Sequence, residues 1–101
     1  MTTQTLAVLR QFLDQPSTRR YGLDLAKGAG LKSGTIYPIL ARLERDGLLT
    51  SAWERIDPSV EGRRPRRYYV LTGVGERVAR EEIAAVRRLL GGVPRPAGEA
   101  R

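Results

Sequence analysis

The sequence contains no cysteine and no histidine among its 101 residues. The lack of cysteine excludes disulfide bonds and thiolate chemistry, and the lack of histidine excludes imidazole ligands and a histidine-dependent catalytic triad. The 11 acidic residues are scattered among arginines, so an all-carboxylate metal site is not expected either. We therefore expect no metal, no cofactor and no enzymatic activity.

Long apolar segments are also missing. No run approaches the roughly 20 apolar residues that span a bilayer. The N-terminus lacks the basic start and apolar core of a signal peptide. The length fits one domain, with or without a tail. These features predict a cytoplasmic protein that does not bind membranes.

Positive charge is what the sequence has in excess. The chain has 18 Lys and Arg residues against 11 Asp and Glu, which gives a formal net charge of +7. This balance favours a polyanionic partner, with nucleic acid ahead of an anionic membrane surface. Charge alone is a weak indicator, because many basic proteins bind neither.

Two short helices are predicted in the first third of the chain. Thr2 or Thr3 caps the first, apolar residues recur along it at helical spacing, and Pro16 closes it. Residues 15–20 are expected to form a turn. The second helix runs over 21–27 and ends where two closely spaced glycines permit the positive φ of a helix stop.

The third predicted helix, residues 33–47 with Ser33 as its cap, is the most informative segment. Its apolar side, which should pack on a core, consists of Ile36, Ile39, Leu40 and Leu43. Its opposite side is small at the N-terminal end and basic at the C-terminal end, with Gly34, Pro38, Ala41, Arg42 and Arg45. Such a helix can approach a DNA major groove closely. An ordinary surface helix with an early proline is the alternative.

The period of the pattern changes after the third helix. Residues 49–55 alternate as a half-exposed strand does, residues 56–65 form a loop, and residues 66–71 return as a second strand. Four arginines stand within five positions at this hairpin: Arg63, Arg64, Arg66 and Arg67. The hairpin is therefore a basic wing.

A final helix capped by Thr72 carries an apolar stripe longer than a small three-helix core can cover. Leaving Val86, Leu89 or Leu90 in water would forfeit roughly 1.5–3 kcal/mol for each side chain. A second copy of the chain would cover the stripe. The dimer would also place the two copies of the third helix about one turn of DNA apart. The expected dimer interface consists of Leu6, Leu9, Val78, Ile83, Val86, Leu89 and Leu90.

The order of three helices, a β-hairpin and one further helix predicts a winged helix-turn-helix, a mainly α fold with a β-hairpin. We assign residues 1–71 to this DNA-binding domain and residues 72–91 to a C-terminal dimerisation helix. Residues 92–101 are rich in Pro, Gly and Ala, which predicts a disordered tail.

Several segments together resemble the PadR family of bacterial transcriptional regulators. They are Tyr-Gly-Leu-Asp-Leu at 21–25, Gly-Thr-Ile-Tyr-Pro-Ile-Leu at 34–40, Leu-Glu at 43–44 with Gly-Leu-Leu at 47–49, and Arg-Arg-Tyr-Tyr-Val-Leu-Thr at 66–72 with Gly75. The similarity covers roughly residues 6–90. The Gly-Thr-Ile-Tyr-Pro element followed by a basic Tyr-Tyr strand is a specific combination.

The resemblance implies a homodimeric DNA-binding regulator, most simply a repressor, that binds inverted repeats. In such proteins the third helix reads the major groove, the wing touches the backbone or minor groove, and the final helix pairs the subunits. Some members release DNA on binding small aromatic or cationic compounds. The chain is similar to the short subgroup with one C-terminal helix, but its wing tip, residues 57–61, is longer and more acidic than the usual glycine-rich tip.

The candidate DNA-binding residues come from the third helix and the wing. The hydroxyl groups of Thr35 and Tyr37 and the free N–H groups at the helix start suit phosphate oxygens. The wing arginines would repel one another unless a polyanion lies near. The full set is Lys32, Ser33, Gly34, Thr35, Tyr37, Pro38, Ala41, Arg42, Arg45, Arg63, Arg64, Arg66 and Arg67.

Each of these predictions has a structural alternative. Tyr37 can be a half-buried packing aromatic, and Arg42 and Arg45 can form a solvated face beside Glu44 and Asp46. The wing arginines can serve solubility alone. For the whole chain, the alternative is a winged-helix module that contacts protein or RNA.

A small-molecule effector is compatible with this interpretation, although a regulator without one is an alternative. For Trp53, a position in the core is favoured over a position in a ligand site. If its strand faces the space under the last helix, the candidate effector pocket consists of Phe12, Trp53 and Val86.

Overall fold

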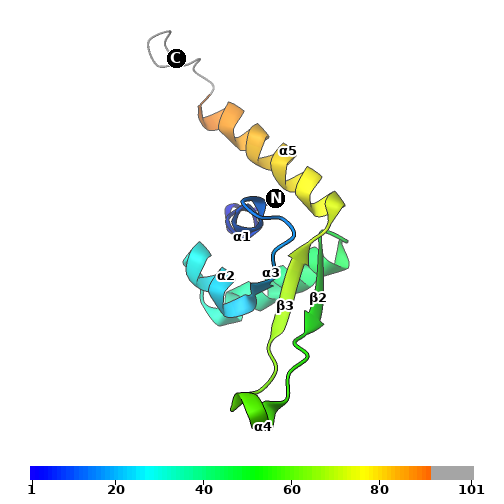
Figure 1. Ribbon diagram of the computed structural model, residues 1–101. Coiled ribbons are helices and arrows are strands. Elements are labelled where there is room, and N and C mark those ends of the chain that lie inside the picture. Colours follow the sequence, from blue (N-terminus) through cyan, green and yellow to red (C-terminus); the bar gives the residue numbers. More distant parts are fainter. Residues whose placement is uncertain (92–101) are drawn as a thin grey trace, which may run out of the picture.

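A computed structural model describes residues 1–91 of the chain (Figure 1). The elements follow in the order α1 (Thr3–Leu13), β1 (Arg20–Tyr21), α2 (Gly22–Ala29), α3 (Ser33–Arg45), β2 (Leu49–Trp53), α4 (Pro58–Glu61), β3 (Arg67–Leu71) and α5 (Gly73–Leu90). The predicted fold class, a winged helix-turn-helix with a further C-terminal helix, is confirmed. The predicted disordered tail lies outside the described residues.

The sheet has one strand more than the sequence predicts. Its order is β1-β3-β2, and both pairings are antiparallel. In β1, Arg20 pairs with Tyr69 and Tyr21 pairs with Tyr68, although Arg20 is predicted in a turn and Tyr21 at the start of a helix. A strand of two residues is too short to show alternation, so periodicity cannot reveal it.

The wing carries a helical turn at its tip. The predicted loop over residues 56–65 contains α4, whose cap Asp57 accepts a hydrogen bond from the Ser59 N–H at 3.0 Å. Pro58 occupies the start of the turn, where a missing N–H costs nothing. Gly62, with φ of 71°, ends it. Figure 1 shows this tip at the end of the hairpin, away from the helices.

Helix α3 begins one residue earlier than its predicted cap implies. Lys32 is the N-cap and offers no side-chain hydrogen bond, so Ser33 is already helical. The predicted apolar side faces inward, with Ile36, Leu40 and Leu43 buried. Pro38 lies inside the helix, where it lacks an N–H to donate to the carbonyl one turn earlier.

The core draws on all the long helices and on both hairpin strands. Leu9 and Phe12 of α1 are each 0% exposed within a single subunit. Leu9 therefore offers no exposed surface to a second copy, and Phe12 offers none to a ligand, so the structure does not support their predicted roles in a dimer interface and an effector pocket. The reason is that α1 packs against both α2 and α5, so its apolar side is covered within the subunit.

Helix α5 is covered over only part of its length. Ala79 is buried and Val78 packs against the core. The helix then continues past the rest of the molecule (Figure 1), and Leu89 and Leu90 remain 81% and 80% exposed. Leu6, Ile83 and Val86 are half-buried in the single subunit.

Thr72 fixes the start of α5. Its hydroxyl donates to the Gly47 carbonyl oxygen at 2.7 Å and accepts from the Gly75 N–H at 2.9 Å. Gly75 lies so close to the turn before β2 that an added Cβ would overlap the Leu48 carbonyl oxygen and lie 2.9 Å from Cδ1 of Leu71. This junction joins the end of β3, the start of β2 and the start of α5.

We expect Gly75→Ala to destabilise the fold by about 1–3 kcal/mol, because its methyl group meets backbone that cannot move aside cheaply. Urea denaturation measures the change. The matched control is Gly73→Ala, where an added Cβ has nothing within 4 Å. Equal stability of the two variants would contradict the close packing at Gly75.

Candidate nucleic-acid interface

The outer side of α3 is open to solvent, as predicted. Every candidate residue on this helix is exposed apart from Thr35, which is half-buried. The structure nevertheless divides the set. Tyr37 and Ala41 lie on the side of the helix toward the wing, whereas Arg42 lines a separate cavity with Met1 and Glu82.

A groove of about 720 Å³ separates α2 and α3 from the base of the wing. We call it the wing groove; its lining includes Tyr21, Lys27, Tyr37, Ala41, Trp53, Arg66 and Arg67. Of the candidate residues, Tyr37 and Ala41 of α3 thus line one concave surface with Arg66 and Arg67 of the wing. Arg63 and Arg64 are not part of this lining. The groove combines aromatic and cationic side chains, which suit a nucleic-acid backbone, with the two carboxylates of Asp24 and Glu44.

Tyr37 is both packed and accessible. A Cβ added at Gly22 would lie 2.6 Å from Cε1 of the Tyr37 ring, so the ring rests directly on the start of α2. The side chain is exposed on its other side, toward the wing groove. The packing alternative thus describes one side of the ring, while the other side is open to solvent.

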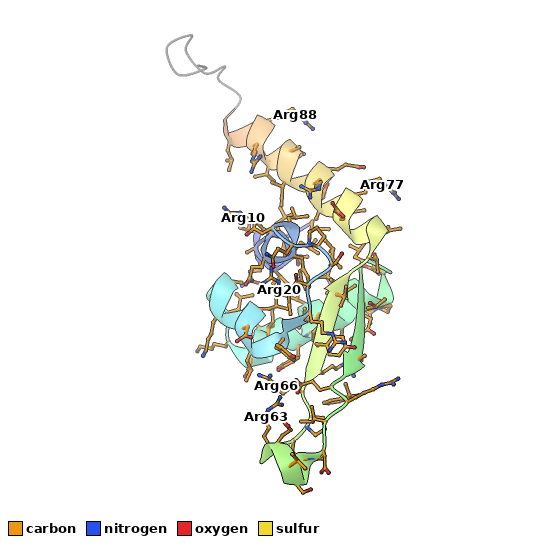
Figure 2. The ribbon with its side chains drawn as sticks, viewed as in Figure 1. Arg10, Arg20, Arg63, Arg66, Arg77 and Arg88 are labelled. Atoms are coloured by element: carbon orange, nitrogen blue, oxygen red, sulfur yellow. The ribbon has the colours of Figure 1, made fainter. Side chains whose placement is uncertain are left out.

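Arginine is not confined to the predicted interface. Figure 2 shows Arg77 and Arg88 on α5, at the opposite end of the molecule from Arg63 and Arg66 of the wing. Net charge alone therefore does not locate a binding surface.

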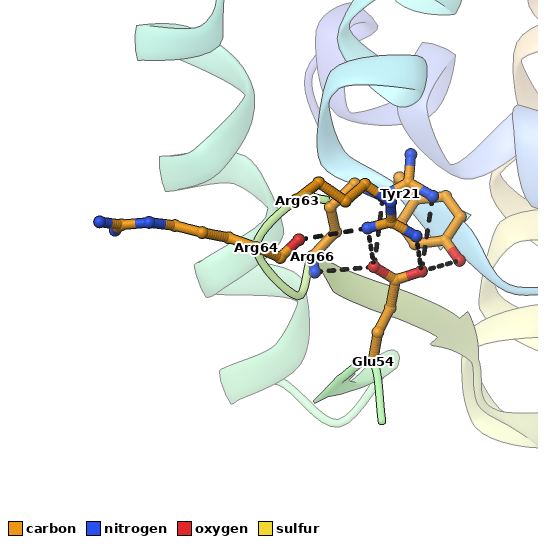
Figure 3. Close-up of polar contacts among 5 residues, drawn as sticks. All are labelled: Tyr21, Glu54, Arg63, Arg64 and Arg66. Atoms are coloured by element: carbon orange, nitrogen blue, oxygen red, sulfur yellow. Dashed lines mark hydrogen bonds and ion pairs between the residues drawn. The ribbon is translucent and has the colours of Figure 1, made fainter. Parts of the chain in front are cut away.

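Glu54 is the residue on which the polar contacts of the wing converge, and it is not among the residues predicted from the sequence. Its carboxylate accepts hydrogen bonds from both terminal nitrogens of Arg63 at 2.6 and 3.1 Å, from the Arg66 backbone N–H at 2.8 Å, and from the Tyr21 hydroxyl at 3.0 Å. Figure 3 shows these side chains converging on it. We call Glu54, Arg63, Arg66 and Tyr21 the wing clamp. The signal in the sequence that indicates this role is a single carboxylate on the hairpin strand opposite the arginine run at 63–67.

Two other wing arginines behave differently from each other. Arg67 donates to the Ser51 hydroxyl at 3.0 and 2.7 Å and lies 3.5 Å from Glu44 of α3. Arg64 points away from the clamp in Figure 3 and has no side-chain acceptor within residues 1–91. Of the four wing arginines, Arg64 is thus the one whose guanidinium group is directed wholly outward.

The clamp lowers the pKa of the Glu54 carboxyl far below its ordinary value of 4.5. The hydrogen bonds from Arg63 are the main cause, and those from Arg66 and Tyr21 act in the same direction, while desolvation opposes them. The Glu54 side chain is only 8% exposed, so this charge is held among its partners.

Trp53 is 59% exposed, so the expectation that it lies in the core is wrong. Only the first residue of β2, Leu49, is buried, because the strand soon leaves the body of the molecule. The predicted effector pocket is also wrong as a set. Trp53 lines the wing groove, Phe12 is sealed in the core and Val86 lies on α5.

Residues 1–91 contain no group of three acidic side chains placed to hold a metal ion. Within the same residues, no helix combines the length and the apolar character that crossing a membrane requires.

The fold is a winged helix-turn-helix of the kind found in transcription regulators. It has three helices and a β-hairpin wing, and the short strand β1 pairs with β3 at one edge of the sheet. The model of the Transcriptional regulator PadR-like family matches residues 13–81. The chain belongs to this family.

Individual relatives agree with this assignment. Over 77 residues the chain is 42% identical to Transcriptional regulator Rv3488 from Mycobacterium tuberculosis (strain ATCC 25618 / H37Rv). The aligned segment covers 70% of this chain and 65% of that protein. The chain thus spans just under two thirds of that relative.

Solved structures show the same architecture. A PadR family transcriptional regulator from Eggerthella lenta DSM 2243 is 33% identical, with a TM-score of 0.67 over 88% of this chain and 80% of that one. The PcaV transcriptional regulator from Streptomyces coelicolor, solved in complex with its natural ligand, is 26% identical, with a TM-score of 0.68 over 99% of this chain and 67% of that one.

We expect the wing clamp to make folding pH-dependent in acid. Because the Glu54 pKa is lowered in the folded state, its contribution is complete above the unfolded value of 4.5 and is lost as pH falls through the folded-state pKa. Urea denaturation from neutral pH to about pH 3 should therefore show a smaller loss of stability for Glu54→Gln than for the wild type. Parallel pH profiles of the two proteins would contradict this assignment.

Proposed function

We propose that the protein is a homodimeric transcriptional repressor that binds an inverted-repeat operator in double-stranded DNA. The observation that carries the proposal is the wing groove, which brings Tyr37 and Ala41 on the exposed side of α3 to one concave surface with Arg66 and Arg67 of the wing. Membership of the PadR-like family supports the same conclusion.

Helix α3 supplies the surface for base contacts. Gly34, Pro38 and Ala41 are exposed and small, so the helix backbone can lie close to base edges. The free N–H groups at its N-terminus and the neighbouring Lys32 and Ser33 suit phosphate oxygens. Arg45, exposed on the last turn, extends the same surface.

The wing supplies backbone contacts. Arg64 is directed outward and Arg67 lies at the edge of the wing groove. Guanidinium groups at these positions would neutralise phosphates on either side of the segment that α3 contacts. Arg63 and Arg66 would face the DNA backbone from the same hairpin, but Glu54 partly offsets their positive charge.

The exposed end of α5 supports a dimer. Burying Leu89 and Leu90 against a second copy would recover roughly 1.5–3 kcal/mol for each side chain. Half-buried Ile83 and Val86 extend the same stripe. A two-fold axis along these helices would also present two α3 helices to an inverted repeat.

A small-molecule effector forms the last part of the proposal. PcaV is a relative whose structure contains its natural ligand. In this chain the wing groove has the aromatic lining suited to such a compound, and a ligand there would compete with DNA for Tyr37 and Arg67.

The test is fluorescence anisotropy with DNA from upstream of the protein's own gene, against a scrambled duplex, at several salt concentrations. We expect at least a hundredfold preference for the first duplex. If each subunit neutralises about four phosphates, a plot of the logarithm of affinity against the logarithm of salt concentration should have a slope of about −7. Equal binding to both duplexes, or to RNA, would contradict the proposal.

We expect Arg64→Ala to weaken binding to both duplexes and to flatten the salt slope by about 1 per subunit, because one phosphate contact is lost. Arg77→Ala is the control, since Arg77 is also exposed but lies on α5, away from the wing (Figure 2). Equal effects of the two variants would remove the wing from the interface.

We expect Leu89→Glu to give monomers in sedimentation equilibrium, because a carboxylate replaces an apolar side chain at the proposed interface. Val60→Glu makes a similar change at an exposed residue of α4 and should leave the dimer intact. A Leu89→Glu protein that remains dimeric would place the interface elsewhere.

A further inference from the structure

We propose that Glu54 is a positioning residue that sets the sequence specificity of DNA binding, by holding two wing arginines inward and fixing the wing against β1. The inference rests on the proposed function, in which the wing contacts DNA. It adds a role for an acidic residue that by its charge alone would only weaken binding to a polyanion.

The clamp uses the whole carboxylate. Oε1 accepts from Arg63 and from the backbone N–H and Nε of Arg66, and Oε2 accepts from the Tyr21 hydroxyl, Arg63 and Arg66. The Arg66 guanidinium also lies 4.1 Å from the centroid of the Tyr21 ring. With every acceptor position engaged, Glu54 has an internal role and is not a ligand for an outside group.

The clamp matters because little else holds the outer wing. Beyond the pair Trp53 and Arg67, one backbone hydrogen bond joins the two arms, from the Glu54 N–H to the Arg66 carbonyl oxygen at 2.9 Å. Helix α4 contributes no buried residue. Within residues 1–91, the orientation of this part of the wing thus depends on polar contacts rather than on an apolar core.

Charge in the clamp affects specificity. Glu54 with Arg63 and Arg66 has a net charge of +1, and removal of the carboxylate charge makes it +2. Phosphates are the same in every sequence, so an added cation strengthens binding to any duplex. Loss of the clamp also frees the wing to move, which weakens only the contacts that need a fixed orientation. Both effects reduce the preference for the operator.

The experiment compares Glu54→Gln with Glu61→Gln, which makes the same charge change at an exposed residue of α4. The Glu61 carboxylate acts on Arg63 through its charge but forms no hydrogen bond within residues 1–91, so this control removes a nearby charge and leaves the clamp bonds in place. Affinities are measured for a duplex selected from random sequence by the wild-type protein and for a scrambled duplex, across salt. For Glu54→Gln we expect severalfold tighter binding to the scrambled duplex, a salt slope steeper by about 0.9 per subunit, and a loss of preference of about tenfold. Glu61→Gln should keep the wild-type preference.

Glu54→Asp separates position from charge. It keeps the carboxylate but shortens the side chain, so we expect the preference to fall while the salt slope stays at the wild-type value. If Glu54→Gln and Glu61→Gln change binding equally, or if Glu54→Asp keeps the full preference, net charge alone acts and the inference is overturned.

Hydrogen exchange without DNA gives an independent result. The Arg66 backbone N–H donates to Glu54, so its exchange should accelerate in both Glu54 variants and not in Glu61→Gln. Unchanged Arg66 exchange would overturn the clamp itself. A wild-type protein that shows no sequence preference, with Arg66 protected as expected, would contradict only the proposed function.

Discussion

The geometry of the molecule depends on the contact between the start of α5 and the turn that precedes β2. Thr72 binds this turn through its side chain and its N–H, and Gly75 lies against the Leu48 backbone. The turn is also where α3 ends. The angle between α3 and α5, the proposed DNA-reading and dimerisation helices, is therefore set at one point, where glycine is the only residue that fits.

The sequence predicted those parts of the fold that have a clear period. The apolar side of α3, the hairpin of β2 and β3, and the Thr72 cap of α5 are all where the pattern places them. The small exposed side of α3 was also predictable, because a helix that buries Ile36, Leu40 and Leu43 must turn Ala41 outward.

The parts that sequence reasoning missed depend on contacts between distant segments. Strand β1 exists only because β3 lies beside it, and the Glu54 clamp joins residues that are 33 positions apart. Leu9 and Leu89 both read as apolar residues of amphipathic helices, yet only the second is exposed. Periodicity shows which side of a helix is apolar, but it does not show whether that side is covered within the chain.

The path between the wing and the reading helix is very short. Tyr21 donates to Glu54 in the wing, and the next residue, Gly22, carries the Tyr37 ring of α3. A force on the wing tip thus reaches α3 through one peptide unit and one aromatic ring. The two elements proposed to contact DNA are therefore coupled through adjacent residues, so a change in the orientation of one is transmitted to the other.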